Sequence, residues 1–351
     1  YASLLMMGIS TSIIGILPPA ASAGVGVVIV LQLMRLAQCF GRGGTWGGGI
    51  LMAYENVPEN KRSFYAAIPQ IGLPIGFGLS SILIAVPTLL LPEDIFFTWG
   101  WRIPFLAAII LTLIVIRQKG EMMETEDYKK AQAKLEAEEA EGKKHKVGFI
   151  PMVKGYWKTL LLGCGTRWVD GTFYNIFIVW ILSYCINWLG MPLIQTYIIT
   201  IIACIFKIPF TLFGGWCAQK LGNTRTFVIG ALASAVLSIP TLKVIELSKG
   251  NLAITIIGIV LGWSIAYNLI WAVISSLWSS YFETEVRYSG ISFVYHVPSF
   301  LVAGMVPTIC TLLINYGKGD TIYVGIYSTV VALISAACAL ALKARHDRGE
   351  K

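Results

Sequence analysis

Long runs of apolar residues, repeated along the whole chain, constrain its fold more than any other feature of the sequence. Most runs are near the length of about 20 residues that an α-helix needs to cross about 30 Å of hydrocarbon. Backbone groups in lipid must be hydrogen-bonded within their own segment, so these runs are expected to be helices. The short alternating stretches of a transmembrane β-barrel are not seen. The sequence therefore predicts an all-α polytopic membrane protein.

Composition and charge agree with a membrane location. Charged residues make up 13% of the 351 residues and hydrophobic residues 56%, whereas soluble domains carry about 25% charged residues. The net charge of +8 would suggest nucleic acid in a soluble protein, but the basic residues lie mostly in short loops between apolar runs. We therefore attribute this charge to membrane topology and expect no nucleic-acid partner.

Ten candidate spans can be placed along the chain. They cover residues 2–18, 25–54, 63–91, 101–118, 157–187, 194–218, 224–247, 252–281, 288–315 and 321–343. One long polar stretch, Lys119–Lys146, separates the fourth span from the fifth. Within it, Glu126 and Lys130 are spaced to pair on one helix face. The stretch is open to two interpretations, an interfacial helix or a flexible linker.

The loop charges predict how the chain is oriented. With the Lys119–Lys146 loop placed in the cytoplasm, alternation of the spans brings most other basic loop residues to the same side: Lys61, Arg62, Lys220, Arg225, Arg287, Lys343, Arg345, Arg348 and Lys351. The opposite loops contain only Arg102, Lys249 and Lys318. This bias is the positive-inside pattern, and it supports both the orientation and the number of spans.

The spans form two groups. Residues 1–118 are predicted to form an incomplete N-terminal helical bundle, 119–156 a cytoplasmic central loop, 157–343 a C-terminal six-helix bundle and 344–351 a cytoplasmic tail. Tyr1 already lies inside an apolar run, with no initiator methionine, charged leader or signal-peptide pattern before it. We expect the sequence to lack its beginning, and two further helices would make the bundles equal.

Arg35 lies well inside the second span. A charge at that depth costs several kcal/mol unless it is paired or faces a wet cavity, so Arg35 is a candidate for substrate binding. Gln38 follows within one turn and is a second candidate. The glycines that come next are interpreted as sites of close helix packing.

Asp170 interrupts the fifth span, with Arg167 three residues earlier on the same helix face. The two side chains can neutralise each other as a structural pair. A carboxylate within the membrane can instead carry a coupling proton, and both interpretations remain open. Tyr174 extends the same face and is a candidate for substrate binding.

Lys207 interrupts the sixth span, and Pro209 is expected to kink the helix beside it. An ammonium group at that depth attracts an anionic substrate or pairs with Asp170. The sequence therefore offers Lys207 as a candidate substrate contact.

A polar and aromatic patch, Tyr267, Asn268 and Trp271, lies in the eighth span, and Asn268 is a candidate substrate contact. His296 in the ninth span, next to Tyr295, is the only histidine predicted to lie within the membrane. A lone histidine is more often a hydrogen-bonding partner between helices, but His296 is also a candidate proton carrier.

The sequence predicts no enzyme, no cofactor and no metal site. Seven cysteines lie within or at the ends of apolar runs, without any CxxC pair, and we interpret them as structural thiols. No hydrolase triad or metal cluster is evident. The glycines of GRGGTWGGG follow a membrane helix rather than a strand, which argues against a phosphate-binding loop.

Several motifs along the chain resemble the metabolite:proton symporters of the major facilitator superfamily. They are RLAQCFGRGGTWGG at 35–48, Glu55, Pro58, Arg62, QIGLPIG at 70–76, WGWRIPFL at 99–106 and VRYSG at 286–290. This branch includes the shikimate, α-ketoglutarate, citrate and proline/betaine transporters. On this alignment Tyr1 falls in the third family helix.

The resemblance implies a major facilitator fold of which about ten of twelve transmembrane helices are present, in a multi-pass protein of the inner (cytoplasmic) membrane. We expect the protein to be a monomer. It also implies gating or loop roles for five residues: Glu55, Arg62, Gly215, Gly222 and Arg287. Two departures bear on coupling, since Thr45 stands where the family usually has Glu and Gln219 where it usually has Asp. Asp170 is then the leading proton carrier.

We predict a secondary active transporter that moves a small metabolite, an organic acid, by alternating access and with proton coupling. Arg35 and Lys207 would supply positive charge for an anion, although a zwitterion would also use one of them. The alternative is a non-transporting, degenerate or truncated membrane protein acting as a sensor. A membrane-embedded enzyme would need a clustered acid–base or metal set.

Overall fold

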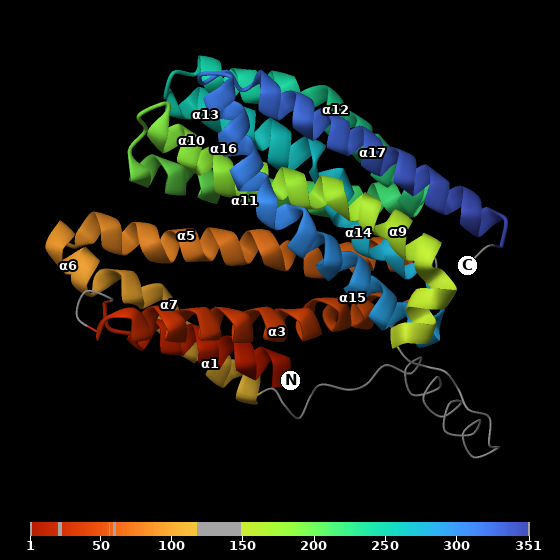
Figure 1. Ribbon diagram of the computed structural model, residues 1–351, viewed down its shortest axis with the longest axis horizontal. Coiled ribbons are helices and arrows are strands. Elements are labelled where there is room, and N and C mark those ends of the chain that lie inside the picture. The colour runs from red at the N-terminus through yellow and green to blue at the C-terminus, as the bar shows by residue number, and fades with distance from the viewer. Residues whose placement is uncertain (1, 20–22, 56, 59–60, 118–148, 350–351) are drawn as a thin grey trace. The chain divides into compact units, whose positions relative to one another are not determined.

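The computed structural model describes residues 2–19, 23–55, 57–58, 61–117 and 149–349 (Figure 1). Every regular element in these residues is a helix. Eight helical segments are long and apolar enough to cross a membrane, and two shorter apolar helices, Ala2–Ile16 and Gly100–Ile114, accompany them. The ten segments match the ten predicted spans, so the all-α polytopic fold is confirmed. The predicted pairing of Glu126 with Lys130 lies outside the described residues.

The helices divide into two compact units, and each is described by itself. The first unit comprises the described residues of 2–49 and 79–117, and the second those of 50–78 and 149–349. The elements of the first unit are α1 (Ala2–Ile16), α3 (Val25–Glu55), α5 (Gly72–Leu90), α6 (Glu93–Thr98), η3 (Gly100–Arg102) and α7 (Ile103–Arg117). The end of α3 and the start of α5 belong to the second unit.

Close packing in the first unit depends on glycines of α1 and α3. A Cβ atom on Gly15 would lie 2.8 Å from the Cβ of Phe105 in α7. A Cβ atom on Gly41 of α3 would lie 2.6 Å from Cγ of Met7 in α1. Small residues therefore let α1 lie close to both of its neighbours, as is usual between membrane helices.

The second unit contains the larger share of the helices. They are α4 (Arg62–Ala67), η2 (Pro69–Ile71), α9 (Phe149–Tyr174), η5 (Asn175–Trp180), α10 (Ile181–Asn187), α11 (Leu193–Leu221), α12 (Asn223–Leu247), α13 (Leu252–Ile259), η6 (Val260–Ala266), α14 (Asn268–Ser279), α15 (Thr284–Leu301), η7 (Ala303–Met305), α16 (Val306–Tyr316) and α17 (Ile322–Asp347). Helix α9 lies against α15 and α17, and α12 lies against α14 and α17.

Helix α11 packs between α14 and α4, and two adjacent glycines permit this. A Cβ atom on Gly214 would lie 2.7 Å from the Cβ of Ala272 in α14. A Cβ atom on Gly215 would lie 2.7 Å from the Cβ of Ala67 in α4. The short helix α4 is thereby fixed against α11 about two turns after Lys207.

Two segments of π-helix interrupt the spans of the second unit. The first, η5, joins α9 to α10 directly after Tyr174, and the second, η6, joins α13 to α14 directly before Tyr267. A π turn carries an extra residue per turn, so it shifts the direction of the side chains that follow. Such turns are rare in proteins overall, and those that occur are often found at functional sites.

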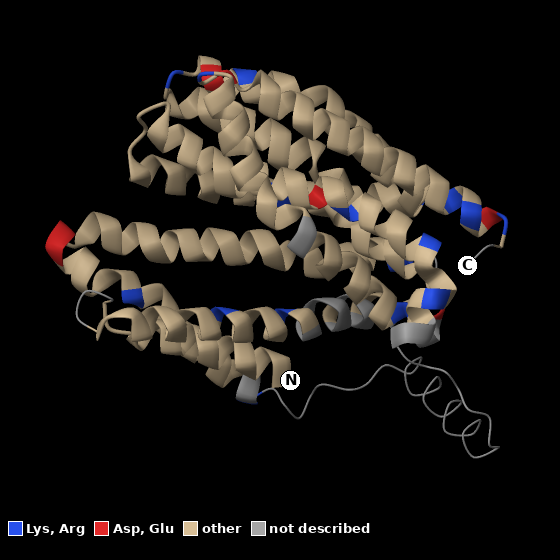
Figure 2. Cartoon of the chain, in the orientation of Figure 1, with Lys and Arg blue, Asp and Glu red and all other residues tan. Residues whose placement is uncertain are grey.

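Figure 2 shows that most Lys and Arg of α9–α17 lie at helix ends, with few charges in between. At one end, Lys243 Nζ lies 3.0 Å from Glu246 Oε1 and 2.7 Å from Asp320 Oδ1. Glu246 Oε2 also accepts from the backbone N–H of Thr321 at 2.8 Å. These contacts hold the end of α12 against the loop before α17.

Candidate functional site

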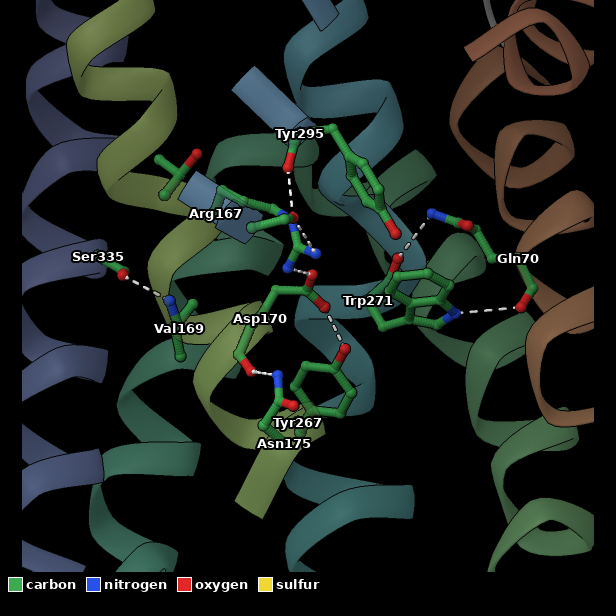
Figure 3. Close-up of polar contacts among 12 residues, drawn as sticks. Gln70, Arg167, Val169, Asp170, Asn175, Tyr267, Trp271, Tyr295 and Ser335 are labelled. Carbon is green, nitrogen blue, oxygen red and sulfur yellow. Dashed lines mark hydrogen bonds and ion pairs between the residues drawn. The ribbon is translucent and has the colours of Figure 1, made fainter. Parts of the chain in front are cut away.

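The C-terminal part of α9 presents Arg167 and Asp170 to the interior of the second unit. Three residues apart on one helix face, they form an ion pair between Arg167 Nη1 and Asp170 Oδ2. They are 7% and 1% exposed. Tyr267, at the junction of η6 and α14, donates its phenolic O–H to Asp170 Oδ1. Each carboxylate oxygen of Asp170 therefore has its own partner (Figure 3).

Arg167 also connects α9 to α15. Its Nη2 donates to Ser299 Oγ at 3.2 Å, and its guanidinium carbon lies 4.4 Å from the centroid of the Tyr295 ring. A guanidinium over an aromatic face is attracted by the ring quadrupole. The N–H on Nε of Arg167 is buried and has no hydrogen-bond partner among the described residues.

Lys207 of α11 is completely buried, and its nitrogen is surrounded by rings and an amide. Nζ donates to Asn268 Oδ1 at 2.9 Å, while Asn268 Nδ2 donates back to the backbone oxygen of Lys207 at 2.8 Å. Nζ lies 4.4 Å from the centroid of the Trp263 ring, 4.3 Å from that of Tyr267 and 6.0 Å from that of Trp271. We call these three aromatic residues the aromatic cage.

The sequence left open whether Lys207 pairs with Asp170. In the structure the two side chains have different partners. Asp170 is engaged by Arg167 and Tyr267, and Lys207 by Asn268. Tyr267 nevertheless connects the two charged positions, because its hydroxyl contacts the carboxylate while its ring face contacts the lysine.

A reciprocal pair of hydrogen bonds joins η2 to α14. Trp271 Nε1 donates to the backbone oxygen of Gln70 at 3.1 Å, and Gln70 Nε2 donates to the backbone oxygen of Trp271 at 3.3 Å (Figure 3). Both residues are buried. One wall of the aromatic cage is therefore fixed by a segment about 200 positions earlier in the chain.

Two further predicted residues lie beside this cluster. Tyr174 ends α9, and its ring centroid is 5.8 Å from that of Phe77 in the first turns of α5. The ring centroid of His296 is 5.0 Å from that of Tyr295, whose ring also contacts Arg167. The structure thus brings His296 next to a residue that contacts the ion pair.

Arg35 and Gln38 lie on α3 within the first unit. Arg35 Nη1 donates to Gln38 Oε1 at 3.1 Å, and Gln38 Nε2 donates to Thr11 Oγ1 of α1 at 2.7 Å. The two residues predicted together from the sequence are therefore in contact with each other.

Four of the five residues for which the resemblance implies gating or loop roles lie at loops or helix ends, and Gly215 lies within α11. The guanidinium carbons of Arg62 and Arg287 lie 5.3 and 5.8 Å from the ring centroid of Tyr54, so both arginines contact one aromatic ring. Gly222 joins α11 to α12 with a φ of 89°, a conformation that favours glycine. Glu55 ends α3, and its side chain lies outside the described residues.

Trp263 is the principal site residue that the sequence analysis did not single out. A spacing signal was available, since Trp263, Tyr267 and Trp271 recur every four residues and so can share one helix face. Ser299, which contacts Arg167, gives no such signal because its role depends on how α15 packs against α9.

A bundle of membrane-length helices with a buried cluster of ionisable side chains defines a membrane transport protein. Comparison with known sequences agrees with this class. The chain belongs to the Major Facilitator Superfamily, which it matches over residues 2–307. It is a membrane transporter and not an enzyme.

Its relatives include named metabolite transporters. It is 32% identical to the inner membrane metabolite transport protein YhjE of Escherichia coli K12, over 99% of this chain and 77% of that protein. It is 30% identical to the shikimate transporter of the same organism, over 96% and 76% of the two chains. It is 27% identical to the proline/betaine transporter of Salmonella typhimurium, over 99% and 69%.

Solved structures share the fold at low sequence identity. The proton:xylose symporter XylE, bound to 6-bromo-6-deoxy-D-glucose, superposes with a TM-score of 0.72 at 15% identity, covering 97% of this chain and 78% of that one. The E. coli fucose:proton symporter FucP gives a TM-score of 0.60 at 13% identity, covering 97% and 83%. The major facilitator fold predicted from the sequence is confirmed.

Proposed function

We propose that this transporter carries a small organic anion together with a proton, by alternating access. The observation that supports this proposal is the cluster of buried ionisable side chains in the second unit. Its ionisable members are two basic side chains, Arg167 and Lys207, and one carboxylate, Asp170. The formal charge of the cluster is thus +1, and a charge within a membrane protein is costly unless it is compensated. A carboxylate-bearing substrate would supply the missing negative charge.

Unused hydrogen-bond donors point to the same substrate class. The Nε of Arg167 and the Nε1 of Trp263 are buried and have no acceptor among the described residues. Buried donors are normally satisfied, so each unpaired donor calls for an explanation. The oxygens of an organic acid would provide acceptors, and an arginine is well suited to a carboxylate.

Proton coupling follows from the position of Asp170 between Arg167 and Tyr267. Protonation of Asp170 would remove its half of the ion pair and leave Arg167 available to a substrate carboxylate. It would also raise the formal charge of the cluster from +1 to +2, which strengthens anion binding. By linkage, a bound anion would in turn favour protonation of Asp170. Proton and anion would then travel together.

The other predicted site residues have subsidiary roles in this proposal. Asn268 positions the amine of Lys207, and Tyr174 and His296 border the cluster. Arg35 and Gln38, on α3 of the first unit, remain proposed substrate-binding residues. Arg62, Arg287, Glu55, Gly215 and Gly222 serve gating or the loops rather than substrate binding.

The arrangement in the membrane is part of the proposal. Residues 119–156 would form the cytoplasmic loop between bundles 1–118 and 157–343, and 344–351 a cytoplasmic tail, because this orientation places most loop lysines and arginines inside. The protein would act as a monomer. The name of the YhjE relative supports a location in the inner membrane of a bacterial cell.

Counterflow in proteoliposomes tests the substrate class. Vesicles containing the full-length protein and unlabelled shikimate should accumulate labelled shikimate, whereas vesicles loaded with glycine betaine or xylose should not accumulate their labelled counterparts. Shikimate is the first organic acid to try because one relative is a shikimate transporter. Counterflow of betaine without that of any organic acid would contradict an anionic substrate, and no counterflow of any solute would favour the sensor-like alternative.

A further inference from the structure

The aromatic cage surrounds one nitrogen atom, and that nitrogen belongs to the protein itself. Trp263, Tyr267 and Trp271 come from one continuous stretch of η6 and α14 and face the same point. Nζ of Lys207 lies at that point, within 4.4 Å of two of the ring centroids. All four side chains are at most 3% exposed.

This geometry is that of a binding site for a ligand cation. Cation–π attraction acts within about 6 Å of a ring centroid, is strongest for tryptophan, and is the usual way to recognise quaternary ammonium groups. The described part of the second unit places no carboxylate in ion-pair contact with Lys207. The rings and Asn268 are therefore the groups that stabilise a positive charge there.

We infer that Lys207 is a tethered occupant of a quaternary ammonium site, and that its side chain determines specificity by excluding cationic solutes from the cage. A short side chain at position 207 would leave the three rings in place with their centre empty. The chain would then bind a trimethylammonium group where it now holds its own ammonium. This inference rests on the proposed function only in placing the cage within the substrate region.

Two of the three rings, those of Tyr267 and Trp271, should keep their positions when Lys207 is shortened, because hydrogen bonds hold them. Trp271 is fixed by its reciprocal hydrogen bonds with Gln70, and Tyr267 by its bond to Asp170. The backbone oxygen of Lys207, which Asn268 contacts, is unaffected by the change.

Calorimetric titration with choline tests this inference on the full-length protein in detergent. Its uncharged analogue 3,3-dimethyl-1-butanol has the same shape with carbon in place of the charged nitrogen. Lys207→Ala should bind choline at least roughly tenfold more tightly than the analogue. Adding Trp263→Leu to Lys207→Ala should remove that preference. Lys207→Met, which keeps the cage filled without a charge, and the wild type should bind neither compound.

Several results would overturn the inference. Equal binding of choline and its analogue by Lys207→Ala would show a plain apolar cavity, and no binding by a folded Lys207→Ala would show that the cage cannot receive a ligand. Should Lys207→Ala fail to fold, binding of choline by the wild type or Lys207→Met would still refute it. If Lys207→Ala binds choline but the wild type transports no organic acid, the inference about the aromatic cage stands and the proposed function is wrong.

Discussion

Tyr267 donates a hydrogen bond to Asp170 across 97 positions of sequence, and the same ring lies 4.3 Å from the nitrogen of Lys207. One side chain therefore contacts both the buried carboxylate and the buried lysine. A change in the charge of Asp170 therefore acts on this tyrosine as well as on Arg167. Asp170, Tyr267 and Lys207 therefore form one continuous set of side-chain contacts in the second unit.

Replacement of Asp170 should uncouple substrate transport from the proton gradient. Asp170→Asn keeps the size of the side chain but cannot release a proton. We expect this variant to retain counterflow of the organic acid while losing its accumulation under an inward proton gradient. Tyr267→Phe is the control, because it removes the hydrogen bond and leaves the carboxyl group able to titrate. Gradient-driven accumulation by Asp170→Asn at the wild-type level would exclude Asp170 as the proton carrier.

Removal of Arg167 should destabilise the protein more than removal of the whole ion pair. Breaking one side of a buried pair leaves an uncompensated charge and typically costs about 3–5 kcal/mol, whereas an apolar replacement of both partners costs much less. Arg167→Met should therefore unfold more readily than Arg167→Met/Asp170→Leu. Thermal unfolding in detergent measures this difference. A double variant less stable than the single one would contradict the ion pair as described.

A methyl group on Gly215 should force α11 away from α4. Its Cβ would lie 2.7 Å from that of Ala67, and such overpacking typically costs about 1–3 kcal/mol. The companion change Ala67→Gly should recover much of the loss. Gly155→Ala is a matched control, since no atom lies within 4 Å of its added Cβ. The free energy of unfolding of these three variants tests the contact, and equal effects of Gly215→Ala and Gly155→Ala would refute it.

Protonation of Asp320 should lower the stability of the fold in acid. Hydrogen bonds from Lys243 and from the backbone N–H of Ile322 lower the pKa of Asp320. The unfolded value is about 3.9, so the ionised carboxylate stabilises the fold above that pH, and this contribution disappears as pH falls through the lower folded value. Asp320→Asn should be slightly less stable at pH 7 and lose less stability in acid.

Because the side chain of Asp320 is 42% exposed, solvent screening keeps this effect small. Asp94→Asn, on the exposed surface of α6, serves as the control and should follow the wild type. Melting temperatures between pH 3 and pH 7 provide the measurement. Parallel curves for the wild type and Asp320→Asn would contradict the predicted dependence.

The fold could be predicted from the sequence because a chain that crosses a membrane needs long apolar helices, and these appear directly as apolar runs in the sequence. The pairing of Arg167 with Asp170 was also visible, since a spacing of three residues brings them to one face. The contacts of Arg167 with Ser299 and of Trp271 with Gln70 were not, because they join helices more than 100 positions apart. Nor could the sequence decide the partner of Lys207, which depends on how α11 meets α14.

Simultaneous recording of proton and substrate movement tests the central claim most directly. Proteoliposomes that contain the full-length protein are held in weakly buffered medium with a pH electrode, and labelled shikimate or another organic acid is added. The account predicts that the external medium becomes more alkaline as the label enters, and that Asp170→Asn abolishes this change. Uptake of the organic acid by the wild type without any alkalinisation would contradict it.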